Sequence, residues 1–113
     1  MSITINAAEY CVHRNGPIIS MVTGSPELDI ANGNFFTLFS ALGLGTCYAG
    51  HMDVRTMRCA LDRFDPALAQ RAGREEGRYF EQGIDADRIA RYVKALRAIL
   101  AFATERGAFI AWS

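Results

Sequence analysis

The sequence predicts an α+β domain: a small sheet, formed by an N-terminal hairpin and a C-terminal strand, with about three helices packed on one face. Two observations lead to this fold class. An Asn-Gly pair lies between two apolar runs near the N-terminus, which is a strong hairpin signal. Near the C-terminus, a long amphipathic pattern is followed by Gly107 and a short apolar run. A long helix that leads into a returning strand favours helices packed on one face of a small sheet.

The hairpin is expected over residues 9–23. Ile3 and Ile5 alternate with polar residues before it, which is a weak strand signal. The turn is assigned to Asn15 and Gly16, because both residue types tolerate a positive φ. The Gly-Ser-Pro sequence at 24–26 then ends the strand.

A first helix is expected to begin near residue 34. Residues 28–34 lead into it, and Asn32 or Asn34 is predicted to cap it through its side chain. Gly43 stands where a left-handed residue ends a helix. Four apolar residues fall at helical spacing, and the short helix is expected to be almost wholly buried: Phe35, Leu38, Phe39 and Leu42.

A second helix is expected after a turn over residues 45–50. Asp53 is a good N-cap, and Met52 and Met57 are placed to pack around it. The helix ends before Pro66, since the residue preceding a proline avoids the α region. Its predicted buried stripe is Val54, Met57, Leu61 and Phe64.

Residues 66–83 carry mixed signals. Residues 67–72 favour a helical turn, whereas three glycines argue against one continuous helix through this region. Residues 78–81 are interpreted as a strand that closes against the sheet.

The last helix has the clearest pattern. Asp85 is predicted to cap it, and Asp87 lies favourably in its positive first turn. Gly107 ends it, and residues 108–112 are predicted to form a buried final strand. One wide apolar stripe runs along the helix: Ile89, Tyr92, Val93, Leu96, Ile99, Leu100 and Ala103.

Two patterns resemble a group of small bacterial proteins. One is the sequence 32–35 that leads to Leu42-Gly43-Leu44. The other is the last helix, its terminal Gly107 and the strand that ends in Trp112. The resemblance covers residues 32–112 and consists mainly of core and capping residues. No activity is attached to that group, so the resemblance implies the same layout and assigns no functional residue.

Composition restricts the function classes. The 113 residues suit one domain, over 1–113, and half of them are apolar, which disfavours disorder. Twelve basic residues balance 12 acidic ones, so the basic surface that nucleic acid requires is not expected. No signal peptide or membrane span is predicted. Three cysteines, an odd number, favour reduced thiols and a cytoplasmic location.

Cysteine and histidine supply the most suggestive chemistry. Cys11, His13, Cys47 and His51 are a legitimate tetrahedral zinc set, although structural zinc sites usually begin with closely paired cysteines. The competing interpretation is that the cysteines are small hydrophobic residues. Cys47 or Cys59 with His51 as base would be a nucleophilic pair, but no family signature surrounds them. No metal or other cofactor is therefore predicted.

Other motifs have structural explanations. Gly43, Gly45 and Gly50 lack the spacing of a phosphate-binding loop and suit a helix end and a turn. Asp85 and Asp87 suit a helix cap and its first turn rather than a pair of catalytic carboxylates.

The back of the last helix is a candidate interface. Phe102 lies there beside the small residues Ala95 and Ala98, with Arg91 one turn further back. Small residues next to one large aromatic allow a second helix to approach closely. Two interpretations of what covers this side of the helix stay open. The cover is either residues 66–80 of the same chain, or it is another molecule, in a symmetric dimer or at a partner-binding surface.

Two functions remain open at this stage. The favoured one is a small non-enzymatic interaction or regulatory protein, of the inhibitor, immunity or adaptor type, whose partner is itself or another protein and neither nucleic acid nor a membrane. The alternative is a small enzyme or metal-binding protein that uses the turn from Cys47 to His51.

Overall fold

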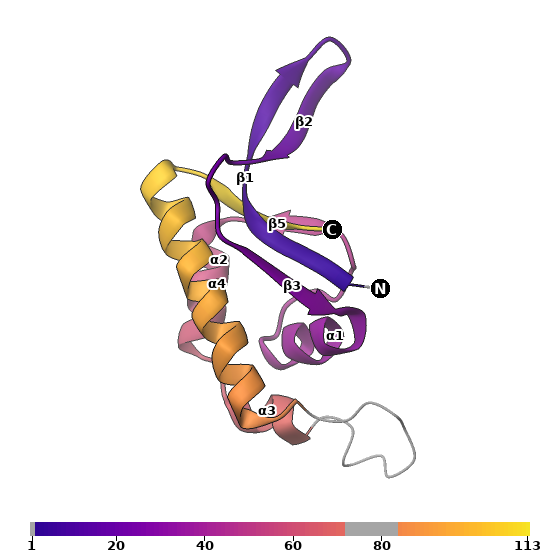
Figure 1. Ribbon diagram of the computed structural model, residues 1–113, viewed down its shortest axis with the longest axis vertical. Helices are drawn as coiled ribbons and strands as arrows, with labels where there is room; N and C mark the ends of the chain where they lie inside the picture. The colour runs from indigo at the N-terminus through magenta and orange to yellow at the C-terminus, as the bar shows by residue number, and fades with distance from the viewer. Residues whose placement is uncertain (1, 72–83) are drawn as a thin grey trace.

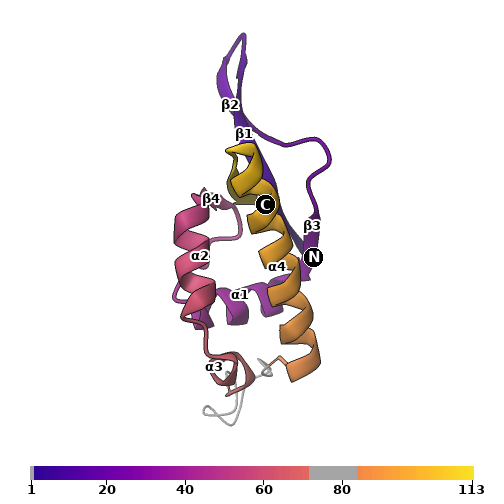
Figure 2. The same ribbon diagram turned by 90° about the vertical axis from the view of Figure 1, so that its left-hand side faces the viewer.

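The computed structural model describes residues 2–71 and 84–113 (Figure 1). In chain order its elements are β1 (Ser2–His13), β2 (Gly16–Met21), β3 (Glu27–Ala31), α1 (Asn32–Ala41), β4 (Gly50–Met52), α2 (Val54–Asp62), α3 (Pro66–Arg71), α4 (Ala86–Arg106) and β5 (Phe109–Trp112). The predicted α+β class is confirmed: the helices pack on one face of a small antiparallel sheet (Figure 2).

The sheet is organised around the long strand β1. Its order is β2-β1-β5-β4, and every pairing is antiparallel. One edge of β1 pairs with β3 over residues 2–6 and with β2 over residues 8–13. The other edge pairs with β5 over residues 5–8. The distal half of β1 therefore forms, with β2, a hairpin that projects beyond the helices (Figure 1).

The core lies between the sheet and the helices. Alternate residues of β1, among them Ile3, Ile5 and Ala7, point toward the helices and are buried. The predicted core residues are buried together in one cluster: Phe35, Leu38, Phe39, Leu42, Leu96, Leu100 and Ile110. The apolar stripes expected on the helices are therefore the surfaces that pack against the sheet.

The hairpin is confirmed, but its turn differs from the expected one. His13 pairs with Gly16, so the loop consists of Arg14 and Asn15. Gly16 has a φ of 106°, whereas none of the described non-glycine residues has a positive φ. Asn15 therefore does not adopt the positive φ that its residue type tolerates, and Gly16 alone supplies it in this turn.

The start of α1 also differs from the prediction. Ala31 is the N-cap residue and makes no side-chain cap bond, so neither Asn32 nor Asn34 caps the helix. Both lie inside its first turn, because β3 continues to Ala31 and the helix begins directly after it. Instead, Asn34 Nδ2 donates to Tyr92 Oη at 3.0 Å, which joins α1 to α4. Phe36 is exposed, so α1 is buried on one side only and the expected near-complete burial is wrong.

The other helix boundaries follow the predicted capping chemistry. Asp53 Oδ1 accepts from the Thr56 N–H at 2.7 Å, and Asp85 Oδ1 accepts from the Arg88 N–H at 2.9 Å. Gly107 ends α4 with a φ of 66°. These local signals fix the starts of α2 and α4 and the point at which the chain turns into β5.

The segment after α2 is described in part. The helix α3 confirms the helical turn expected over residues 67–72 as far as Arg71. The strand expected over residues 78–81 lies outside the described residues. Among the helices that are described, none is long and apolar enough to cross a membrane.

Candidate functional site

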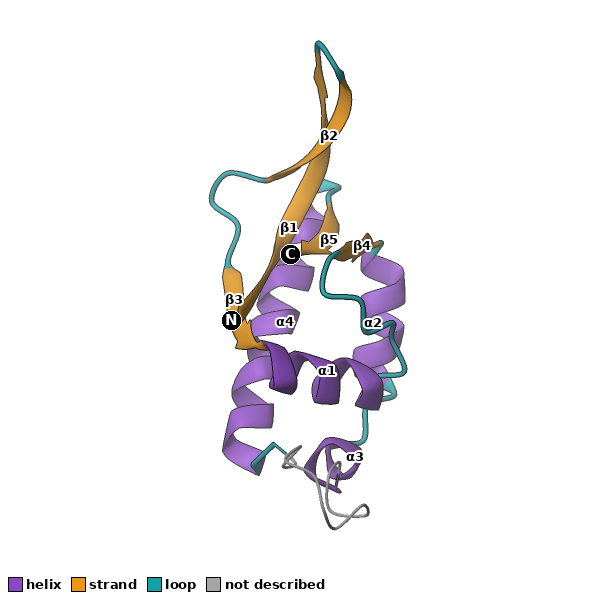
Figure 3. Cartoon of the chain, turned by 90° about the vertical axis from the view of Figure 1, so that its right-hand side faces the viewer, coloured by secondary structure: helices purple, strands orange, loops and turns teal. Residues whose placement is uncertain are grey.

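The face of the sheet opposite the helices is the candidate functional surface, and we call it the open face (Figure 3). Side chains alternate along β1, so Tyr10 and Val12 point to the face opposite the buried Ile3 and Ile5. Directly paired residues share a face of the sheet. Its members on the other strands are therefore found from the pairings Tyr10↔Ile19, Ala8↔Met21, Ala8↔Phe109, Asn6↔Ala111 and His51↔Ala111.

The distal half of the open face exposes large apolar side chains. The exposed fractions are 59% for Tyr10, 89% for Val12, 42% for Ile19 and 46% for Met21. With Ile18 on the opposite side of β2, the hairpin carries five of the eight large hydrophobic residues that are exposed in the described part of the chain. We call Tyr10, Val12, Ile19, Met21 and Phe109 the apolar patch.

An aromatic cluster anchors the base of this patch. The ring centroids of Tyr10 and Phe109 are 4.9 Å apart, and those of His51 and Phe109 are 5.3 Å apart. The Tyr10 and His51 rings meet edge to face at 6.1 Å. The three rings come from β1, β5 and β4, so strands far apart in the sequence hold the base of the hairpin in place.

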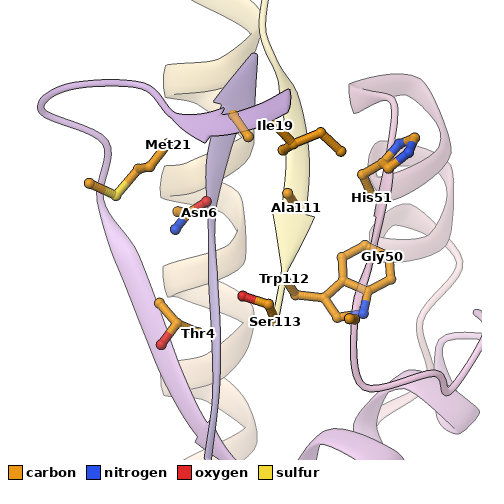
Figure 4. A pocket seen from close by; sticks show the side chains of 11 residues that line it. Thr4, Asn6, Ile19, Met21, Gly50, His51, Ala111, Trp112 and Ser113 are labelled. Atoms are coloured by element: carbon orange, nitrogen blue, oxygen red, sulfur yellow. The ribbon is translucent and has the colours of Figure 1, made fainter. Parts of the chain in front are cut away.

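A shallow pocket of about 440 Å³ lies beside the cluster (Figure 4). Ile19 and Met21 line it from β2, Asn6 from β1, His51 from β4 and Ala111 from β5. Its walls are largely apolar, and its polar groups are the Asn6 amide, the His51 imidazole and the hydroxyls of Thr4 and Ser113, which suits an apolar side chain that carries a polar end.

The half of the open face near β3 is polar. Thr4 pairs with Asp29, and Asn6 pairs with Glu27. The Thr4 hydroxyl donates to Asp29 Oδ1 at 2.6 Å. The open face is therefore divided into an acidic half beside β3 and an apolar half on the hairpin.

The cysteine and histidine candidates are distributed over several elements. Cys11 is half-buried on β1, Cys47 is exposed in the segment before β4, and Cys59 is exposed on α2. Within the described residues there is no group of three or more His, Cys, Asp or Glu side chains that could hold a metal ion. The side chain of His13 lies outside the described part of the structure.

His51 and Cys47 both have structural contacts. The imidazole ring of His51 belongs to the aromatic cluster. The backbone carbonyl of Cys47 accepts from Trp112 Nε1 at 2.9 Å. His51 thus contacts the aromatic cluster on the open face, and the Cys47 carbonyl holds the Trp112 indole on the other side of the sheet.

The candidate interface on α4 is partly covered. Arg91 and Ala98 are exposed, whereas Ala95 and Phe102 are partly buried and pack against the core. The guanidinium carbon of Arg106 lies 5.0 Å from the centre of the Phe102 ring. Contacts within the chain thus account for part of the cover that the sequence requires for Phe102, and the dimer through this helix stays a prediction.

The candidate residues predicted from the sequence do not include the apolar patch, although a signal for it is present. Tyr10 and Val12 are two residues apart, as are Ile19 and Met21, which is the spacing of one strand face. Only the structure shows that the helices cover the other side. Comparisons of the chain with protein-family models, with curated proteins and with solved structures found no match.

Proposed function

We propose that this chain is a small non-enzymatic interaction protein, of the inhibitor, immunity or adaptor type, that binds another protein through its apolar patch. The observation that carries the proposal is the exposure of four large apolar side chains on one face of the β1–β2 hairpin: Tyr10, Val12, Ile19 and Met21. Contiguous exposed apolar surface of this kind marks interaction sites in proteins.

The chemistry of the patch supports binding rather than catalysis. Its five members carry no carboxylate, amine or thiol, and the adjacent His51 contacts the rings of Tyr10 and Phe109. Fully burying a large apolar side chain contributes about 1.5–3 kcal/mol. The partly exposed side chains of the patch together supply several such contributions, centred on an aromatic anchor of the kind that dominates protein interfaces.

The expected partner presents an apolar surface with a basic flank. Its apolar part would cover the hairpin, and its basic flank would lie over Glu27 and Asp29, which share the open face. The free thiols of Cys11, Cys47 and Cys59 support a cytoplasmic location for the encounter.

Photo-crosslinking in cells tests the proposal. A photoreactive phenylalanine analogue is placed at Ile19, inside the patch, and in a matched variant at Ser40, which is exposed on α1. We expect one discrete adduct with another protein from position 19 and none from position 40. The adduct partner is then purified and its affinity for the wild-type chain is measured.

The decisive step uses Ile19→Glu, which places a charge in the patch. We expect at least a tenfold loss of affinity for the purified partner, with the circular dichroism spectrum unchanged. A folded Ile19→Glu variant that binds as tightly as wild type, or an adduct formed only from position 40, contradicts the proposal.

A further inference from the structure

The two edges of β1 are used unequally. Thr4 exchanges both backbone hydrogen bonds with Ser113, at 3.0 and 3.2 Å, on the β5 side. In an antiparallel strand, alternate residues direct both their N–H and C=O groups to the same edge. The backbone groups of Ala8, Tyr10 and Val12 therefore point to the β5 edge as well.

The opposite edge of β1 is filled along its length. Pairing with β3 gives way to pairing with β2 around Ala7. At this junction the Ala7 carbonyl accepts from the Val22 N–H at 3.0 Å, and the Ala7 N–H donates to Ser25 Oγ at 2.9 Å. No gap is left on that side.

The β5 edge is open beyond Ala8. The pairing of β1 with β5 ends at Ala8↔Phe109. Among the described residues no strand continues beside Tyr10 and Val12, whose two N–H and two C=O groups face outward on this edge. Their side chains are also the most exposed of the patch.

The hairpin protects one edge and leaves this one unprotected. On β2, residues 16, 18 and 20 pair with the odd residues of β1 that point toward β2, so residues 17, 19 and 21 direct their backbone groups outward. Residue 17 is a proline, which has no N–H to offer, and proline is a common device against edge pairing. The free stretch of β1 contains no proline or lysine.

We propose that a second copy of this chain pairs with the free edge of β1 in antiparallel orientation, about a twofold axis at Cys11. This register places Tyr10 of each copy opposite Val12 of the other copy, so the dimer contains two equivalent pairs. It satisfies all four outward backbone groups of each chain with four hydrogen bonds. A register centred on Tyr10 or on Val12 leaves some of these groups unpaired or uses the turn.

Side-chain chemistry favours the same orientation. Val12 and Tyr10 of the two copies become direct cross-strand neighbours, and aromatic–β-branched pairs stabilise sheets. Glu9 and Arg14 are both exposed and lie at opposite ends of the free stretch. In this register Arg14 of each copy lies one position beyond the residue opposite Glu9 of the other copy, so opposite charges lie at each end of the pairing, whereas parallel pairing would place like charges together.

The pairing is separate from the proposed binding function. It uses the strand edge and needs no other protein, so it is tested on the purified chain alone. It would also join the two apolar patches into one surface across a four-stranded ribbon.

The first test is light scattering from micromolar to millimolar concentration. We expect a dimer that Val12→Pro weakens about tenfold or more, because the substitution removes two of the four intermolecular hydrogen bonds. The Val12 N–H is not used in the pairing with β2, so the hairpin remains. Ile19→Pro is the matched control, since it removes an outward N–H from the other edge, and it should leave the dimer intact.

Val12→Lys provides a second variant whose folding is not in question, because Val12 is 89% exposed. It should also weaken the dimer. A wild-type chain that is monomeric over the whole range overturns the proposal. So does a dimer that withstands both Val12 variants, or one that only Phe102→Glu dissociates, which would place the contact on α4.

The second test traps the register. In a Cys47→Ser, Cys59→Ser variant only Cys11 remains, and the proposed axis places the two Cys11 residues in a non-hydrogen-bonded pair at a separation that a disulfide spans. Diamide, which takes up two hydrogen atoms as two thiols join, should give a covalent dimer. Failure to crosslink under conditions in which scattering shows a dimer overturns the register.

Discussion

Trp112 joins the sheet to α1, because its ring packs against Phe35 and Phe39. Its indole ring lies 5.3 Å from the Phe39 ring centroid, and its Nε1 donates to the Cys47 carbonyl. On β4, Gly50 pairs directly with it. A Cβ at Gly50 would lie 2.9 Å from Trp112 Cζ2, closer than carbon atoms pack. Gly50 is thus required by the position of the indole.

Gly50→Ala is expected to lower the free energy of unfolding by about 1–3 kcal/mol, because an indole held by Phe39 and by a hydrogen bond has to move. Trp112 is the only tryptophan, so its fluorescence reports both the movement and the urea midpoint. Gly45→Ala is the control, since nothing lies within 4 Å of its added Cβ. Equal midpoints for the two variants would contradict this account.

Asp53 contributes to stability in a pH-dependent way. Hydrogen bonds from the Thr56 side chain and backbone N–H lower the pKa of its carboxyl group. A lowered folded pKa means that the stabilisation is present above the unfolded pKa, about 3.9, and is lost as the pH falls through the folded pKa. Asp53→Ala should therefore be less stable than wild type at pH 7, and the difference should shrink below about pH 3.9.

Urea denaturation of both proteins from pH 2 to pH 7 measures this difference. A gap between wild type and Asp53→Ala that stays constant across the range would show that the carboxylate charge is not the source of the cap's stability.

At the scale of elements, α4 is the helix that the sequence predicts best and the one that carries the largest share of the core. Leu96, near the middle of α4, is 0% exposed, so Leu96→Ala should lower the free energy of unfolding by about 2–5 kcal/mol. Leu68→Ala on α3 makes the same chemical change at a side chain that is 50% exposed, and should cost much less. Chemical denaturation compares the two, and similar losses would remove Leu96 from the core.

The elements predicted from sequence are those with local signals. Asp53, Asp85 and Gly107 act through bonds to residues three or four positions away, so their roles can be recognised in a single stretch of sequence. The strand β4 has only three residues and exists because it pairs with β5, some 60 residues later. Its pairing is non-local, and no pattern within residues 50–52 indicates it.

The start of α1 shows a second limit of local signals. Asparagine is a strong N-cap residue, and Asn32 and Asn34 both stand near the helix start. The pairing of β3 with β1 extends to Ala31, however, and this makes Ala31 the N-cap residue, one position before Asn32 and three before Asn34. A tertiary contact, the bond from Asn34 to Tyr92, then uses the side chain that the local signal assigned to capping.

At the scale of the whole molecule, the fold places the helices of the described residues on one side of the sheet, and no described element covers the other side. The sequence predicts this layering, and the structure confirms it. The sequence contains the alternating pattern of the apolar patch but does not show that the patch is exposed, because an alternating strand has the same pattern whether a helix or a partner covers it. Position in the assembled sheet, rather than residue type, distinguishes the buried Ile5 from the exposed Ile19.

Pro17 affects how many other copies can pair with the edges of the β1–β2 hairpin. A hairpin that can pair at both of its edges adds copies without limit and forms a fibre. A hairpin that can pair at one edge only binds one other copy, and assembly stops at a dimer. Pro17 lies opposite Val12 on β2, with its missing N–H on the outer side of the hairpin. In the proposed dimer, Pro17 thus weakens pairing at the outer edge of β2 and favours assembly that stops at two copies.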